Sequence, residues 1–130
     1  MIEPSRIPIL KIRDFLVASI QVELHDHSAV QFKDNLLQHI YETKAKGLIL
    51  DLTAMEVVDS FMGRIITEVG TMAGLMGTKL VITGLRPSVA ITLVELGLEL
   101  KGVYTALNLE KGIAMLERII ASGTSSAGER

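Results

Sequence analysis

Asp59 and Ser60 place a carboxylate beside a hydroxyl, and these two side chains have the most potential for chemistry in the chain. A catalytic serine needs a general base within hydrogen-bond reach and a third group that orients that base. Asp59 is adjacent to Ser60, but consecutive residues at a helix start point apart, and the spacing brings no histidine near the hydroxyl. We therefore predict no catalytic residue and no enzyme activity.

Two other roles remain open for this pair. An Asp or Ser at the start of a helix satisfies unpaired backbone N–H groups and contributes about 1 kcal/mol as an N-cap. Alternatively, the Ser60 hydroxyl accepts a phosphoryl group, with a charge of about −1.5 to −2, at a helix N-terminus that tolerates anions. The residue types alone favour the cap and leave the modification open.

Metal and nucleotide sites have weaker signals. His25 and His27 flank Asp26, and His39 follows a helix later. A His-x-His pair can bind zinc, but the spacing shows no third or fourth ligand. The glycines of the central helix do not form a phosphate-binding motif; they are Gly63, Gly70, Gly74 and Gly77. We predict no metal and no cofactor.

A strand, a turn and a helix between Gly47 and Gly77 position the Asp-Ser pair. The run Leu48-Ile49-Leu50-Asp51-Leu52 has the length and composition of a buried parallel strand. From Phe61 onward, apolar residues recur every three or four positions, as on one face of a helix. Asp59 and Ser60 thus lie at the carboxyl end of a strand, where functional sites of open α/β sheets gather.

The flanking sequence predicts the remaining elements. We expect a hairpin of strands at residues 7–12 and 15–22, a helix from Asp26 or Ser28 to about residue 45, and strands at 79–83 and 103–107. A helix follows each of the last two strands, and the first of these has apolar positions Val89, Leu93, Val94 and Leu96. The order ββαβαβαβα predicts one α/β domain with a mixed sheet and four helices at residues 1–121, before a disordered polar tail at 122–130.

Composition excludes several functional classes. The chain has 130 residues, a formal charge of −2 and no cysteine, which argues against a nucleic-acid surface and a disulfide framework. It shows neither a signal peptide nor an apolar run of about 20 residues, so we expect a soluble, cytoplasmic protein. Hydrophobic residues make up 48% but aromatic residues only 4%, which predicts exposed aliphatic side chains that a partner covers.

The central stretch resembles the signature of the STAS domain family, the family of the anti-sigma-factor antagonists. The resemblance is carried by LILDLTAMEVVDSFMGRII and, downstream, by KLVITGLRPSV followed by Leu96-Gly97. It covers nearly the whole chain up to the tail, in the order of that family. Simple antagonists follow Asp-Ser with a small residue and Gly, whereas this chain has Phe61-Met62-Gly63, which is more similar to the RsbS-type scaffold subunits of the stressosome.

The resemblance implies a non-catalytic scaffold in stress signalling. Such a scaffold co-assembles with RsbR-type STAS proteins and sequesters an RsbT-type serine/threonine kinase. The kinase phosphorylates the serine that aligns with Ser60 and is released, and a phosphatase resets the scaffold. The partner-binding residues expected around Ser60 are Glu56, Asp59, Phe61, Met62 and Arg64.

Three alternatives stay open. The chain could be a simple antagonist that binds one anti-sigma kinase, a STAS subunit of a lipid-transport complex, or a small enzyme or ligand-binding domain that uses the same strand-end crevice. A scaffold elutes as a very large particle with its STAS partner, whereas an antagonist elutes as a monomer or dimer. A bound small molecule would favour the last alternative.

Overall fold

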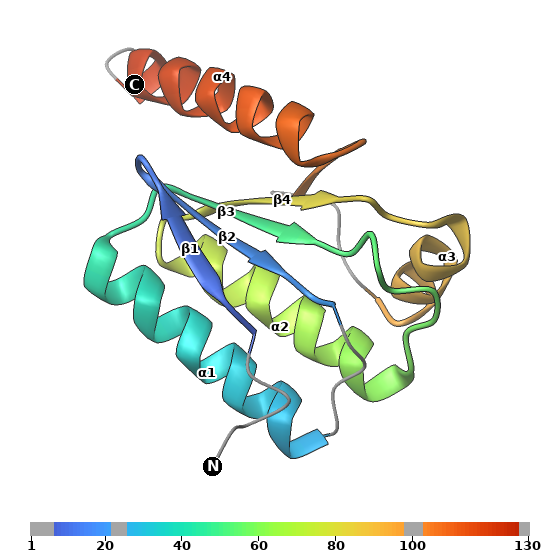
Figure 1. The fold of residues 1–130 in the computed structure, drawn as a ribbon. Helices are drawn as coiled ribbons and strands as arrows, with labels where there is room; N and C mark the ends of the chain where they lie inside the picture. The colour runs from blue at the N-terminus through green and yellow to red at the C-terminus, as the bar shows by residue number, and fades with distance from the viewer. Residues whose placement is uncertain (1–6, 22–25, 98–102, 128–130) are drawn as a thin grey trace.

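A computed structural model describes residues 7–21, 26–97 and 103–127 (Figure 1). In chain order, the elements are β1 (Ile9–Ile12), β2 (Phe15–Ser19), α1 (Asp26–Thr43), β3 (Gly47–Asp51), α2 (Ser60–Leu75), β4 (Lys79–Thr83), α3 (Pro87–Glu95), β5 (Val103–Ala106) and α4 (Leu109–Ala127). This order confirms the predicted α/β fold with ββαβαβαβα topology. Val22, the predicted end of the second strand, and His25 lie outside the described residues.

The strands form one sheet in the order β1-β2-β3-β4-β5, with β3 at its centre. Strand β1 runs antiparallel to β2 through a tight hairpin, and the other neighbouring pairs are parallel. The register pairs Ser19 with Asp51, and Asp51 with Thr83. The carboxyl ends of β2, β3 and β4 therefore meet at one edge of the sheet, directly before the segments that lead into helices α1, α2 and α3.

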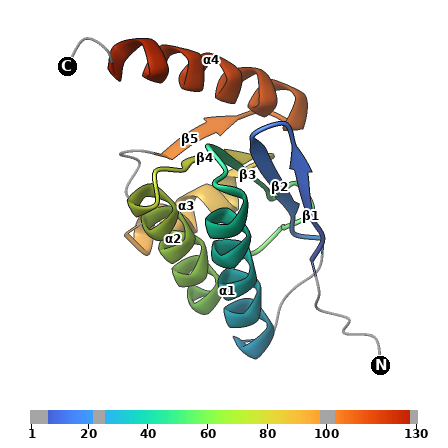
Figure 2. The same ribbon diagram turned by 90° about the vertical axis from the view of Figure 1, so that its left-hand side faces the viewer.

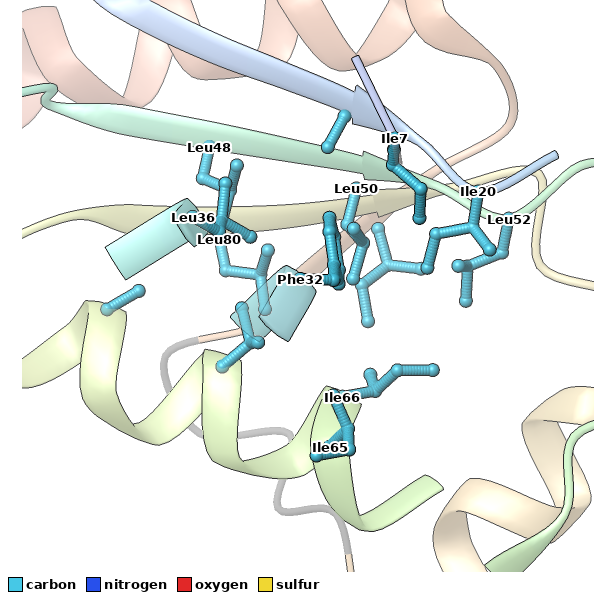
Figure 3. Close-up of a cluster of buried hydrophobic side chains, with 14 of the residues drawn as sticks. Ile7, Ile20, Phe32, Leu36, Leu48, Leu50, Leu52, Ile65, Ile66 and Leu80 are labelled. Carbon is cyan, nitrogen blue, oxygen red and sulfur yellow. The ribbon is translucent and has the colours of Figure 1, made fainter. Parts of the chain in front are cut away.

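Helices cover both faces of the sheet, and the alternation of side chains along the strands explains how. Figure 2 shows α4 alone on one face, with α1, α2 and α3 on the other. In β3, Leu48 and Leu50 belong to the large core beneath α1, α2 and α3, whereas Ile49 belongs to the smaller core beneath α4. Figure 3 shows the large core, where Phe32 and Leu36 of α1 meet the sheet.

Helix α4 continues through Ala127, beyond residue 121 where the domain was predicted to end. The amphipathic turns of this helix already pack on the sheet, and each further residue then adds one backbone hydrogen bond without a new nucleation cost. The small polar residues 122–127 are accordingly helical rather than part of a disordered tail. No helix among the described residues is long and apolar enough to cross a bilayer.

Large apolar side chains are exposed, as the composition predicted. One group lies on α3 and in the loop before α2, and a second lies at the carboxyl ends of α1 and α2. Further examples lie on β1 and near the start of α4. The exposed residues are Leu10, Tyr41, Val57, Leu75, Met76, Ile91, Val94, Leu96, Leu107 and Leu109.

Shortening Leu116 tests the packing of α4. Leu116 is fully buried between α4 and the sheet, whereas Leu109 on the same helix is 39% exposed. We expect Leu116→Ala to lower the free energy of unfolding by about 2–5 kcal/mol because it leaves a cavity. The matched change Leu109→Ala should cost about 1 kcal/mol or less. Equal losses in urea denaturation would contradict the described packing of this helix.

Candidate functional site

The carboxylate of Asp51 joins three strands at the carboxyl edge of the sheet. Its Oδ1 accepts hydrogen bonds from Thr83 Oγ1 at 2.6 Å and from Thr53 Oγ1 at 2.9 Å. Its Oδ2 accepts one from Ser19 Oγ at 3.3 Å. Thr83 is completely buried, so this acceptor satisfies a hydroxyl that water does not reach. The ends of β2, β3 and β4 are thereby tied at the point where the loop toward Ser60 begins.

The turn after β4 holds the loop between β3 and α2 in place. Arg86 donates from Nε and Nη2 to the Thr53 carbonyl oxygen, at 3.3 and 3.2 Å. Ser88 Oγ donates to the Glu56 carbonyl oxygen at 3.1 Å. Gly84 packs so closely on Thr53 that an added Cβ would lie 2.9 Å from the Thr53 Cα. The turn after β4 therefore holds the loop at two residues, Thr53 and Glu56.

Asp59 is the N-cap of α2, which resolves the choice between Asp59 and Ser60. Its backbone is extended, with φ −84° and ψ 174°, and its Oδ1 accepts a hydrogen bond from the Met62 N–H at 2.7 Å. The Asp59 carbonyl oxygen accepts the first helical bond, from Gly63 N–H at 2.9 Å. The capping role expected for one of these two residues thus falls to Asp59.

Ser60 is the first residue of α2 and is exposed. Its hydroxyl makes no hydrogen bond to any part of the chain that the structure describes. A hydroxyl paired with a base, as nucleophilic catalysis requires, is therefore not formed within the described residues. What the site offers is an accessible, unpartnered hydroxyl at the end of a firmly held loop.

The partner-binding residues expected around Ser60 divide into surface and core. Glu56, Asp59 and Arg64 are exposed, and Phe61 is half-buried against the core. Met62 is only 5% exposed and belongs to the large core. The partner contact expected for Met62 is therefore not supported: this side chain lies three and four residues before Ile65 and Ile66 and shares their buried face.

The interpretation of the sequence did not place exposed apolar side chains in the loop before α2 and on α3. Val57 is 76% exposed in the loop, and α3 exposes Ile91 and Val94 while burying its Val89 and Leu93. Helix α3 is apolar on nearly all sides, so periodicity alone did not separate its inner face from its outer face.

Leu96, just after α3, brings this apolar surface to the first turn of α2. Its Cδ1 occupies the space that a Cβ on Gly63 would fill. Gly63 follows Ser60 by three residues, so the two residues lie on the same side of α2. Figure 1 shows α3 beside the first turn of α2. The missing side chain at Gly63 was the sequence signal for this close approach.

The predicted absence of a metal site concerns three histidines. Among the described residues, no group of three or more His, Cys, Asp or Glu side chains is arranged to hold a metal ion. His27 is exposed, and His39 Nδ1 lies 2.9 Å from the Asn35 carbonyl oxygen. These two histidines thus occupy the surface of α1.

Comparisons with known proteins agree with the observed α/β fold. A family model described as STAS domain matches residues 6–111. A variant of RsbS from Moorella thermoacetica is 46% identical, with a TM-score of 0.83 over 89% of this chain and 98% of that chain. A chain from a structure of the molecular architecture of the stressosome, a signal integration and transduction hub, is 49% identical, with a TM-score of 0.79 over 87% of this chain and 98% of that chain.

Two curated relatives are longer proteins than this chain. The RsbT co-antagonist protein RsbRA of Bacillus subtilis (strain 168) is 33% identical over 98 residues, which are 75% of this chain and 34% of that protein. RsbRD of the same organism, also an RsbT co-antagonist protein, is 30% identical over 115 residues, which are 88% of this chain and 41% of that protein. The chain thus spans less than half the length of these curated relatives.

Two glycine substitutions test how the turn after β4 holds the loop. Gly84 and Gly77 both have positive φ angles, of 69° and 81°, but an added Cβ meets Thr53 only at Gly84 and nothing within 4 Å at Gly77. We expect Gly77→Ala to cost about 1–2 kcal/mol from backbone strain alone. Gly84→Ala should cost about 1–3 kcal/mol more, because Thr53 must move. If denaturation gives both variants the same stability, the contact with Thr53 does not hold the loop.

Proposed function

Because this chain belongs to the STAS domain family, we propose that it is a non-catalytic scaffold of the RsbS type that changes partners when Ser60 is phosphorylated. In this proposal, the chain co-assembles in the cytoplasm with RsbR-type STAS proteins and holds an RsbT-type serine/threonine kinase. The kinase transfers the γ-phosphoryl group of ATP to Ser60 Oγ, which yields phosphoserine, ADP and a proton, and the kinase then dissociates. A phosphatase hydrolyses the phosphoserine and restores the binding state.

The observation that carries this proposal is the division of roles between Asp59 and Ser60. Asp59 caps the helix through Met62 N–H, and the exposed Ser60 hydroxyl makes no hydrogen bond within the described residues. A phosphoryl group on Ser60 therefore displaces no hydrogen bond that the described fold uses. Modification then alters the charge of the surface and leaves the fold in place.

The surface around Ser60 suits a partner that responds to this charge. Glu56 and Asp59, four residues and one residue before Ser60, are exposed, and Val57 adds exposed apolar surface to the same loop. A phosphate with a charge of about −1.5 to −2 would add to these carboxylates. In a complex, the kinase would cover this charge, and an uncompensated buried charge costs about 3–5 kcal/mol, where each 1.4 kcal/mol is a tenfold change in affinity.

The exposed apolar side chains support the assembly part of the proposal. They lie on several elements, including β1, α3 and the carboxyl end of α2. A small domain that exposes this much aliphatic surface gains from covering it with another protein. Because this chain is similar to a chain of the stressosome and to RsbT co-antagonist proteins, we propose that other STAS domains cover this surface.

We predict that Ser60 is the residue the kinase modifies and that its charge controls binding. With kinase and ATP, the wild type should gain one phosphate at Ser60, and Ser60→Ala should gain none while it still binds the kinase. Ser60→Asp should bind more weakly, because it places a negative charge in the contact surface. The free energy of unfolding of Ser60→Ala should lie within about 0.5 kcal/mol of the wild-type value, because the hydroxyl makes no hydrogen bond within the described residues. Mass spectrometry measures the phosphorylation, and calorimetry measures the kinase affinity and the stability.

Ser122→Ala is the matched control for this experiment. Ser122 is also an exposed serine, but it lies on α4, on the opposite face of the sheet from α2 (Figure 2). The control variant should be phosphorylated at Ser60 like the wild type. Equal kinase affinity for the unmodified protein, its phosphorylated form and Ser60→Asp would falsify the proposed switch.

We also predict a large assembly with an RsbR-type protein. Contacts between apolar side chains depend little on ionic strength, whereas exposed ion pairs are screened. In sedimentation velocity, the mixture should form a particle much larger than either protein, and the particle should survive an increase from about 0.1 to about 1 M salt. A monomer or dimer in the mixture would instead indicate a simple antagonist.

A further inference from the structure

Arg64 lies one helical turn after Ser60 on α2, and both residues are exposed. Residues four positions apart in a helix are neighbours on its surface, with about 5–6 Å between their Cβ atoms. Within the described residues, the Arg64 guanidinium makes no ion pair and no hydrogen bond. A free cation therefore stands within side-chain reach of a free hydroxyl.

The structure explains why Arg64 lacks an acidic partner. Glu68 follows Arg64 by four residues and is the other charged residue of α2. Its Oε1, however, lies 3.0 Å from Lys33 Nζ of α1, in a pair that is partly buried between the two helices. The order of a cation before an anion along the helix is also the less favourable one for such a pair. Lys33 thus occupies the carboxylate that would otherwise bind Arg64.

We propose that Arg64 binds the phosphate of phospho-Ser60 and holds it against the surface of α2. An anion four residues before a cation is the favourable order in a helix. Guanidinium remains charged at any physiological pH, and its forked N–H groups match two phosphate oxygens. Phosphorylation would then turn Arg64 from a cation open to a partner into one member of an ion pair. This inference rests on the proposed phosphorylation of Ser60.

The other charged residues in this part of the surface do not take the role proposed for Arg64. Glu56 and Asp59 in the loop and Glu95 at the end of α3 are exposed carboxylates, which favour the protonated phosphate. Arg86 is held at the Thr53 carbonyl oxygen. Arg64 is thus the cation of α2 that favours the doubly charged phosphate, and its removal should raise the second pKa of the phosphate.

The test uses protein that carries phosphoserine at position 60, inserted during translation, so it does not depend on the kinase. A ³¹P NMR titration measures the second pKa of the phosphate. We expect this pKa to be about 0.3 lower in the wild type than in Arg64→Gln. The Nε–H resonance of Arg64 should also shift on phosphorylation. Arg118→Gln, an exposed change on α4 across the sheet, is the control and should leave the pKa unchanged.

Lys33→Met provides a second test, because it frees Glu68 to bind Arg64. The pKa of the phosphate should then rise part of the way toward its value in Arg64→Gln. A pKa that does not rise would overturn the role of Lys33 in keeping Arg64 free.

The titration and the kinase experiment fail separately. Equal pKa values in the wild type and Arg64→Gln overturn the Arg64 inference, even if the kinase modifies Ser60. A lower pKa in the wild type supports the ion pair, and absence of kinase binding would then overturn the proposed function alone.

Discussion

The carboxylate of Asp51 is the constraint on which the candidate site depends. Parallel pairing brings the ends of β2, β3 and β4 to the same edge, and Asp51 accepts hydroxyl hydrogen bonds from both neighbouring strands and from the start of the loop. These bonds replace water around a half-buried carboxylate, which would otherwise be costly to desolvate. No buried side-chain nitrogen or oxygen in the described residues lacks a partner. The loop toward Ser60 thus begins from a fixed point.

Beyond Asp51, the residues that hold the loop differ from the residue that is exposed for modification. Thr53 and Glu56 accept hydrogen bonds from the turn after β4, and Asp59 closes the first turn of α2. Ser60 follows this chain of contacts and takes no part in it. Such an arrangement suits a reversible chemical signal, because a change at Ser60 alters the surface without removing a bond from the scaffold.

Local patterns predicted the elements well, because strand and helix periods are properties of short segments. The switch in apolar spacing at Phe61 placed the start of α2 within one residue of its observed position, Ser60. The same spacing indicated that Met62 is buried, because Met62 precedes Ile65 and Ile66 by three and four residues. Its interpretation as a partner contact gave too much weight to its proximity to Ser60.

Other features depend on contacts between distant segments and have no local signal. Asp51 meets Ser19 and Thr83, each 32 residues away, and only the register of the sheet brings them together. The lack of an ion pair at Arg64 depends on Lys33 of another helix. Likewise, α3 is apolar on most sides, so its exposed face became clear only from its packing.

Amide hydrogen exchange in Asp51→Ala tests most directly the claim that a preformed loop presents Ser60. The amides of Leu52, Met55 and Met62 donate to Thr83 O, Leu52 O and Asp59 Oδ1. We expect these three amides to lose more protection than core amides of β3 do, as in a local opening of the loop. If all amides lose protection equally, or the three loop amides keep theirs, Asp51 does not hold the loop that presents Ser60.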